Sequence, residues 1–258
     1  MRSDVTASRE DSGRGRLAGK VALVTGIETE TGLAIGERFG AEGATVVGCV
    51  GSGQRAATQA EPPVPMAMLD GNISVAADAE RIVAWIMSEH LRLDVLVNYG
   101  AARRVVGSIL DITDAEFDEE MRADLKSVIV LSRAVIPAMA RGDGGAIINI
   151  SSIARAGVRG RALRSASKAA LATLTCSMAL DHGEQGIRVN ALLLGPTLTS
   201  DMRARQEQVS QLESETPLGQ LHTPEDVAAA ALFFASDDAA RITGALLPLD
   251  AGRSLPHF

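Results

Sequence analysis

Short runs of β-branched and apolar residues alternate with helical patterns along nearly the whole chain, and this alternation restricts the fold more than any other feature. Seven runs are expected to be buried parallel strands, at residues 21–26, 44–50, 66–69, 94–98, 146–151, 187–194 and 245–250. Helical patterns lie at residues 31–43, 75–90, 114–140, 164–183 and 224–236. Such alternation produces βαβ units with right-handed crossovers. We therefore predict an α/β fold, a doubly wound parallel sheet with helices on both faces and a ligand crevice at the carboxyl ends of its strands.

The composition excludes several classes of protein. A chain of 258 residues that is 46% hydrophobic can bury one core of ordinary size, so we expect a single domain. A net charge of −7 offers no basic surface to nucleic acid. Apolar runs such as residues 227–235 are too short to span a bilayer, and the histidines and cysteines lack metal-ligand spacing. We expect a cytoplasmic protein that binds neither nucleic acid, membrane nor metal.

Two segments stand apart from the alternating pattern. Residues 1–16 are polar and charged without an apolar stretch, which is typical of a disordered tail rather than a signal peptide. The domain is then expected to occupy residues 17–258. Residues 197–218 are polar and lack a clean apolar stripe, so we expect them to form a lid over the crevice.

The strand at residues 21–26 passes directly into a helix through Gly26 and Gly32. Glycines in such a turn let the backbone approach a pyrophosphate seated on the helix N-terminus. With several stretches further along, the turn resembles the short-chain dehydrogenase/reductase family: LAGKVALVTG, LDVLVN, LSRAVIPAM, INISS, SASKAAL, GIRVNAL and residues 217–252. The resemblance runs from Leu17 to Gly252. It implies a Rossmann-like fold, an NAD(P) coenzyme and a carbonyl or alcohol substrate.

Two departures from the family pattern fall where the resemblance places the coenzyme. Glu30 replaces the middle glycine of TGxxxGxG, and NNAG becomes Asn98-Tyr99-Gly100-Ala101. A carboxylate about 5 Å from a phosphate repels it by about 3 kcal/mol per charge at an effective dielectric of about 20. The Tyr99 ring would fill part of the space that the coenzyme occupies in the family. The alternative is that Glu30 points to solvent and Tyr99 is half-exposed. We expect no coenzyme, or weakly bound NAD(P), at positions Gly26, Glu30, Gly32, Asp70, Asn98, Tyr99, Gly195 and Thr199.

The preference between the two coenzymes stays open. The second strand ends without an acidic residue that would hold a ribose 2′-hydroxyl, and Arg55 is the nearby candidate for a 2′-phosphate.

The resemblance also assigns a proton relay of Ser, Tyr, Lys and Asn, of which two have changed. Ser152 matches the serine and Lys168 the lysine of YxxxK, whereas Arg164 replaces the tyrosine and Asp124 the asparagine. An arginine stays charged and cannot exchange a proton in catalysis. Arg164 and Lys168 are one helical turn apart, where two cations repel, so we expect Asp124 to pair with both. This cluster is either a static salt bridge or an oxyanion pocket with Asp124 as base.

Three functions are compatible with this pattern. We expect a diverged biosynthetic enzyme that performs non-redox acid/base chemistry, such as cyclisation, dehydration or isomerisation, on a small carbonyl compound. The alternatives are an NAD(P)-dependent carbonyl reductase or alcohol dehydrogenase with an unusual proton donor, and a noncatalytic partner subunit. We expect an apolar wall for the substrate formed by Val105, Val106, Ile109 and Leu110. The helix at residues 167–180 is apolar nearly all round, which favours a homodimer or homotetramer.

Overall fold

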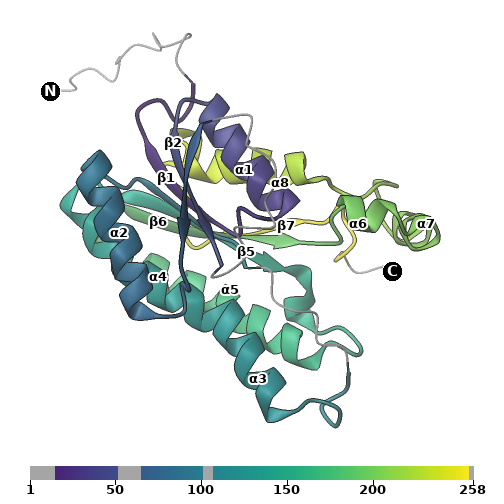
Figure 1. The fold of residues 1–258 in the computed structure, drawn as a ribbon. Helices are drawn as coiled ribbons and strands as arrows, with labels where there is room; N and C mark the ends of the chain where they lie inside the picture. The colour runs from purple at the N-terminus through teal and green to yellow at the C-terminus, as the bar shows by residue number, and fades with distance from the viewer. Residues whose placement is uncertain (1–14, 52–64, 101–106, 256–258) are drawn as a thin grey trace, which may run out of the picture.

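The computed structural model describes residues 15–51, 65–100 and 107–255, and these form one parallel sheet with helices on both faces (Figure 1). The sheet has seven strands in the order β3-β2-β1-β4-β5-β6-β7. The strands are β1 (Val21–Thr25), β2 (Thr45–Val50), β3 (Met66–Asp70), β4 (Val95–Asn98), β5 (Gly145–Ser152), β6 (Ile187–Leu194) and β7 (Leu246–Leu249). Every neighbouring pair is parallel. The predicted seven-stranded, doubly wound sheet is confirmed.

The long helices divide between the two faces of the sheet. One face carries α1 (Glu30–Ala41) and α8 (Pro224–Ala235), and the other carries α2 (Ala76–His90), α4 (Ser127–Arg141) and α5 (Ala162–His182) (Figure 1). Shorter elements complete the described chain: α3 (Asp114–Met121), α6 (Ser200–Arg203), α7 (Gln206–Ser214), the π-helical turn η2 (Arg122–Lys126) and the 3₁₀ turns η3 (Ile153–Ala156), η4 (Gly183–Gln185) and η5 (Asp237–Ala239).

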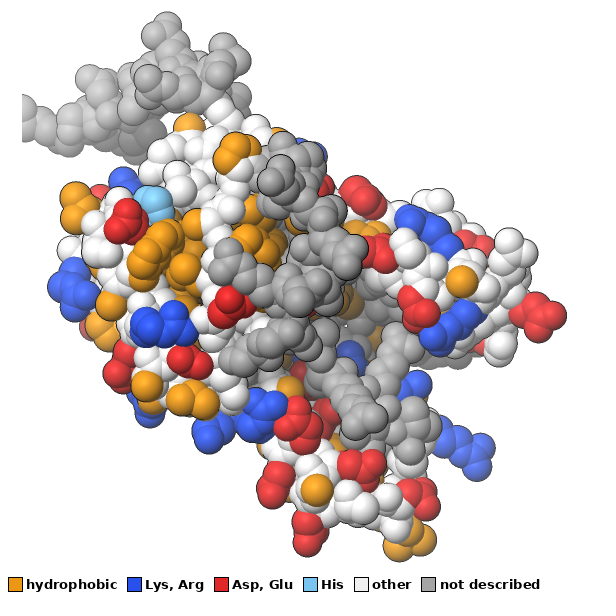
Figure 2. Space-filling view, in the orientation of Figure 1, with side chains coloured by type: hydrophobic (Ala, Val, Ile, Leu, Met, Phe, Trp, Pro, Cys, Tyr) orange, Lys and Arg blue, Asp and Glu red, His pale blue; other side chains and the backbone are white. Residues whose placement is uncertain are grey.

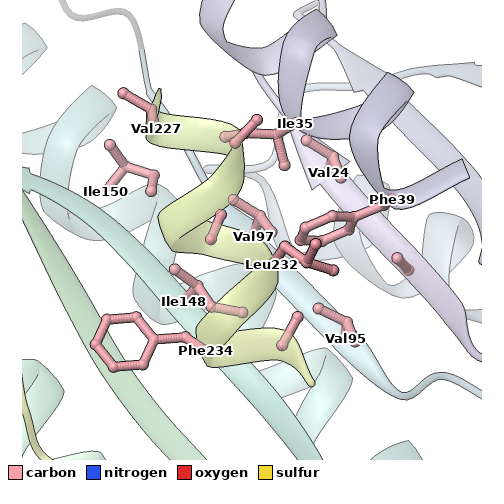
Figure 3. Packing of buried hydrophobic residues seen from close by; sticks show 14 of the residues in the cluster. Val24, Ile35, Phe39, Val95, Val97, Ile148, Ile150, Val227, Leu232 and Phe234 are labelled. Carbon is pink, nitrogen blue, oxygen red and sulfur yellow. The ribbon is translucent and has the colours of Figure 1, made fainter. Parts of the chain in front are cut away.

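Each face of the sheet buries its own hydrophobic cluster. On the face of α1 and α8, strand residues interdigitate with helix residues, as Figure 3 shows for Val24, Val95, Val97, Ile148, Ile35, Phe39, Leu232 and Phe234. Full burial of a side chain of this size contributes about 1.5–3 kcal/mol. Because both faces of β1 are buried, its residues from Val21 to Val24 are all apolar. The core therefore fixes β1 and β4 at the centre of the sheet.

The order of the strands in the sheet reverses at β1: β2 and β3 are added on one side of it, and β4 to β7 on the other. β2 lies on one side of β1 and β4 on the other, so the loops that follow β1 and β4 diverge at this point. A crevice forms where such loops part, and ligands of doubly wound sheets bind there. The Thr25 hydroxyl ties the two strand ends together, since it donates to the Tyr99 carbonyl and accepts from the Tyr99 amide, both at 2.9 Å.

The helix predicted over residues 114–140 is interrupted. The structure divides it into α3, η2 and α4, with Asp124 inside the π-helical turn. A π-helical turn inserts one residue into a helix and is frequent at functional sites. The apolar spacing of residues 114–140 does not reveal this insertion.

The two segments expected outside the core pattern are placed only in part. The described chain begins at Gly15, and Arg16 already donates to the hydroxyl of Ser236 and forms an ion pair with Asp238; the rest of the expected tail lies outside the described residues. The expected lid, residues 197–218, contains the short helices α6 and α7 at one end of the molecule (Figure 1).

Candidate active site

Two cavities open at the carboxyl ends of the central strands, on either side of Tyr99 and Gly100. The first has a volume of about 250 Å³ and lies beside β1, β2 and β3, lined among others by Gly26, Glu28, Cys49, Asn72 and Arg122. The second has a volume of about 220 Å³ and lies beside β5 and β6, lined among others by Ser152, Arg164, Lys168, Gly195 and Thr199. Because both include Tyr99 and Gly100, they form one crevice across the switch point of the sheet.

The turn after β1 fits a dinucleotide. Gly26 has φ +67°, a left-handed conformation that favours glycine, and a Cβ atom there would lie 2.6 Å from the Tyr99 carbonyl oxygen. A Cβ atom on Gly32 would lie 2.1 Å from the Gly26 carbonyl oxygen, so only glycine lets the start of α1 close onto the turn. The Thr29 hydroxyl caps α1 by accepting from the Gly32 amide. These features bring the helix N-terminus to the crevice, where a pyrophosphate would bind.

Glu30 does not occupy this cradle. Its side chain is exposed and lines neither cavity. Both carboxylate oxygens accept from the Ser200 amide, at 3.0 and 2.9 Å. The prediction that Glu30 narrows the phosphate site is therefore wrong in its geometry: the carboxylate reaches across to the start of α6 instead.

The other positions assigned to the coenzyme surround the crevice at different depths. Tyr99 is half-buried and lines both cavities, so its ring does occupy part of the crevice. Asn98 lies deeper, where its amide donates to Asn149 at 2.9 Å. Asp70 ends β3, and the residues that follow it, Gly71 and Asn72, line the first cavity.

The segment that follows β6 lines the second cavity. The Gly195 amide donates to the Leu249 carbonyl, and a Cβ atom on Gly195 would lie 2.9 Å from the Cβ atom of Asp250. Thr199 lines the same cavity and caps α6. The segment expected to act as a lid therefore begins at the crevice itself.

Lys168 and Asp124 form a buried ion pair beside the second cavity. The Lys168 Nζ and Asp124 Oδ1 atoms are 2.9 Å apart, and the two side chains are 4% and 0% exposed. The other carboxylate oxygen of Asp124 accepts from the Ser167 hydroxyl at 2.9 Å. Because α5 carries Lys168 and Ser167 and η2 carries Asp124, the pair joins two elements. Such a pair is tolerated in a protein interior only when its atoms are hydrogen-bonded, as here.

Burial is the largest influence on the pKa of Lys168 and lowers it. The Asp124 carboxylate opposes this change, and the positive charge of Arg164 adds to it. An ammonium group with a lowered pKa releases its proton more readily near neutral pH, as a general acid must.

Ser152 and Arg164 line the same cavity as Lys168, but neither joins the ion pair. The Ser152 hydroxyl donates to the Leu194 carbonyl at 3.1 Å and accepts from the Ala154 amide at 3.2 Å. Arg164 is half-buried. Among the described residues its guanidinium has no hydrogen bond or ion pair, so the expectation that Asp124 pairs with both cations holds for Lys168 alone.

Glu120 is a further residue of this site and is not among those expected from the sequence. Acidic side chains gather over α3 (Figure 2), and Asp118 and Glu119 there are exposed, but Glu120 is only 2% exposed. Burial raises its pKa most and the Asp124 carboxylate raises it further, whereas the positive charges of Arg164 and Lys168 lower it. Glu120 therefore belongs to the same charge cluster as Lys168, Asp124 and Arg164. Its spacing of four residues from Asp124 is the signal in the sequence that places both on one side of a helix.

The expected apolar wall is wrong where the structure describes it. Ile109 and Leu110 are 74% and 91% exposed and line neither cavity. Val105, Val106 and Arg55 lie outside the described residues.

Within the described ranges, no three His, Cys, Asp or Glu side chains are grouped so that they could hold a metal ion. In the same ranges, every helix is too short or too polar to cross a bilayer.

Comparison with known proteins agrees with this geometry. The family model described as enoyl-(acyl carrier protein) reductase matches residues 26–254. An uncharacterized oxidoreductase of Thermotoga maritima is 35% identical, over 91% of this chain and 97% of the relative. Dehydrogenase/reductase SDR family member 4 of Oryctolagus cuniculus is 33% identical, over 93% and 95%. The ligand-free aldohexose dehydrogenase of Thermoplasma acidophilum superposes with a TM-score of 0.85 and 27% identity, covering 95% of this chain and 98% of that structure.

These relatives overturn the expectation of no coenzyme or a weakly bound one. Their names are those of oxidoreductases, dehydrogenases and reductases, the class of enzyme for which the family resemblance implies an NAD(P) coenzyme. The cradle of Gly26 and Gly32 is intact, and Glu30 lies outside it. The comparisons also favour an oxidoreductase over the expected non-redox chemistry. Sequence, fold and comparisons together show that this chain belongs to the short-chain dehydrogenase/reductase family.

Proposed function

We propose that the protein is an NAD(P)-dependent oxidoreductase that interconverts a small carbonyl compound and its alcohol, with Lys168 exchanging the proton. The observation that carries this proposal is the buried Lys168–Asp124 pair at the wall of a cavity adjoining the dinucleotide cradle. Lys168 lines this cavity, and burial lowers the pKa of its ammonium group.

The coenzyme would supply the hydride to the carbonyl carbon during reduction and accept it during oxidation. Its adenosine half would lie in the cavity of Glu28 and Asn72, and its nicotinamide half beside Gly195 and Thr199, which follow β6.

In reduction, the carbonyl π electrons move to the oxygen, and the Lys168 ammonium gives that oxygen a proton. Lys168 is then a neutral amine, still within hydrogen-bond distance of Asp124, and regains a proton before the next turnover. The Ser167 hydroxyl holds the second oxygen of Asp124 throughout.

Arg164 and Ser152 have supporting roles in this scheme. Arg164 cannot provide the proton because a guanidinium does not titrate in the working range, but its charge stabilises negative charge that develops on the substrate oxygen. The Ser152 hydroxyl can donate to the same oxygen once it turns away from the Leu194 carbonyl.

The test combines coenzyme binding with turnover. Calorimetric titration with NADH and NADPH should show micromolar binding of at least one coenzyme, and oxidation of that coenzyme should depend on an added carbonyl compound. Lys168→Met alone leaves Asp124 unpaired and endangers the fold, so it is combined with Asp124→Asn, which removes both charges. The double variant should bind coenzyme and lose turnover by about 10²–10⁴-fold.

Lys126→Ala is the matched control, because Lys126 lies in the same π-helical turn as Asp124 but is exposed. It should keep wild-type turnover. Absence of binding by either coenzyme, or a double variant as active as the wild type, would contradict the proposal.

A further inference from the structure

Arg164 is a half-buried cation at the wall of the second cavity. In the described part of the chain its guanidinium makes no hydrogen bond or ion pair. A cation that is partly removed from water needs a partner to offset the lost hydration. Arg164 lines the cavity that it shares with Lys168 and Ser152, where such a partner can bind.

The Asp124 carboxylate is already engaged. One of its oxygens accepts from Lys168 and the other from Ser167, each at 2.9 Å. Glu120 is buried beside Asp124 and, among the described residues, forms no ion pair with Arg164. No described carboxylate is therefore paired with the Arg164 guanidinium.

The position of Arg164 determines which anion it can hold. Arg164 and Lys168 are one turn apart on α5 and line the same cavity of about 220 Å³. Residues at this spacing have Cβ atoms about 5–6 Å apart, so a short molecule can contact both side chains. A planar guanidinium binds a carboxylate through two parallel hydrogen bonds.

We propose that the substrates are short 2- or 3-oxo acids and the corresponding hydroxy acids, whose carboxylate pairs with Arg164 while the reacting oxygen faces Lys168. This proposal rests on the proposed function, because it assigns the substrate class of the same site. The carboxylate itself is unchanged in the reaction. Arg164 thereby orients the carbonyl carbon, which takes the hydride, and the carbonyl oxygen, which takes the proton from Lys168.

The first experiment measures binding alone, with oxamate as an unreactive analogue of a 2-oxo acid. Calorimetry on the wild type, with and without saturating coenzyme, should detect oxamate binding. Arg164→Gln should weaken it by about 10- to 100-fold, the range expected for loss of charged hydrogen bonds. Arg164→Lys keeps the charge but loses the paired geometry, so it should weaken binding less. Arg159→Gln is the control, because Arg159 is an exposed arginine before the same helix, and it should bind as the wild type does.

The second experiment compares turnover of a 2-oxo acid with turnover of its methyl ester. The wild type should prefer the acid in kcat/KM by about 10- to 100-fold, and Arg164→Gln should lose this preference. Equal turnover of acid and ester by the wild type would overturn the acidic substrate class and leave the oxidoreductase proposal standing. Oxamate binding that depends on Arg164, in a protein that transfers no hydride, would support the anion site and contradict the proposed function. No oxamate binding under either condition would overturn the anion site.

Discussion

Lys168 of α5 and Asp124 of η2 are held 2.9 Å apart with almost no exposure to water. Asp124 lies in the π-helical turn between α3 and α4, and from there its carboxylate meets Lys168 of α5. A buried ion pair contributes little net stability compared with apolar residues of the same shape, but an unpaired member is costly. Removing one partner and removing both should therefore have different effects.

We expect Lys168→Met to lower the free energy of unfolding by about 3 kcal/mol, since it leaves the Asp124 carboxylate buried with Ser167 as its remaining partner. Adding Asp124→Asn should restore most of this loss, because the double variant buries no charge. Urea denaturation of the wild type, both single variants and the double variant measures the coupling. Additive effects of the two substitutions would show that the ion pair is not formed in solution.

Glu120 should make the protein less stable as the pH rises. Its pKa in the folded protein lies above the ordinary glutamate value of 4.5, so its stabilising contribution is complete below 4.5 and is lost as the pH rises through the raised value. Glu120→Gln resembles the protonated form and cannot lose a proton. The melting temperature of this variant relative to the wild type should therefore increase from pH 4 towards pH 8.

Glu119→Gln is the natural comparison for Glu120→Gln, because the two residues are adjacent. The pKa of Glu119 is lowered by its bond with Arg122, so its contribution is present at neutral pH and disappears as the pH falls. The melting temperature of Glu119→Gln relative to the wild type should therefore decrease from pH 4 towards pH 8, the opposite of the trend expected for Glu120→Gln. Identical pH dependence in both variants would contradict the burial of Glu120.

The fold could be predicted from the sequence because parallel strands buried on both faces leave long apolar runs, and β1 and β6 are clear examples. The site could be predicted only in part. Position along a motif places Ser152, Arg164 and Lys168 around one cavity. A position in a motif does not determine the direction in which a long side chain points. Glu30 is the example, because its carboxylate accepts from the Ser200 amide instead of entering the phosphate cradle.

Glu120 shows the other limit of the sequence. Asp118, Glu119 and Glu120 form one acidic run, and a run of this kind usually lies on a solvated face. Only the packing of α3 and η2 against α5 distinguishes the buried member from its exposed neighbours. The prediction of an apolar wall was wrong for a related reason: Ile109 and Leu110 are hydrophobic but lie in a turn, outside every described strand and helix, and are exposed.

Glu28 should favour NADH over NADPH. It lines the cavity assigned to the adenosine half, and its Oε2 atom is buried without a hydrogen-bond partner among the described residues. The carboxylate also acts on Cys49 in the same cavity, whose pKa burial and the Glu28 charge raise to about 12. Oε2 can accept a hydrogen bond from a ribose hydroxyl, whereas a 2′-phosphate would be repelled.

The measurement is a pair of titrations with NADH and NADPH. Glu28→Gln removes the charge and should improve NADPH affinity by about tenfold, with a smaller change for NADH. Glu89→Gln, at an exposed site near the end of α2, controls for the change in net charge. Tighter binding of NADPH than NADH by the wild type would contradict this role of Glu28.

Glu30 should hold the lid segment against the start of α1. Its carboxylate accepts from the amide of Ser200, the first residue of α6, and α6 lies within the expected lid. An exposed charged hydrogen bond contributes about 0.5–1.5 kcal/mol, so Glu30→Ala should increase hydrogen exchange at the Ser200 amide by about 2- to 10-fold and speed coenzyme release. Glu37→Ala on the same helix changes the charge equally, but among the described residues Glu37 forms no hydrogen bond with α6. Hydrogen exchange at the Ser200 amide that is as slow in both variants as in the wild type would contradict this role. Other contacts would then hold the lid segment, and Glu30 would be a surface residue without influence on the crevice.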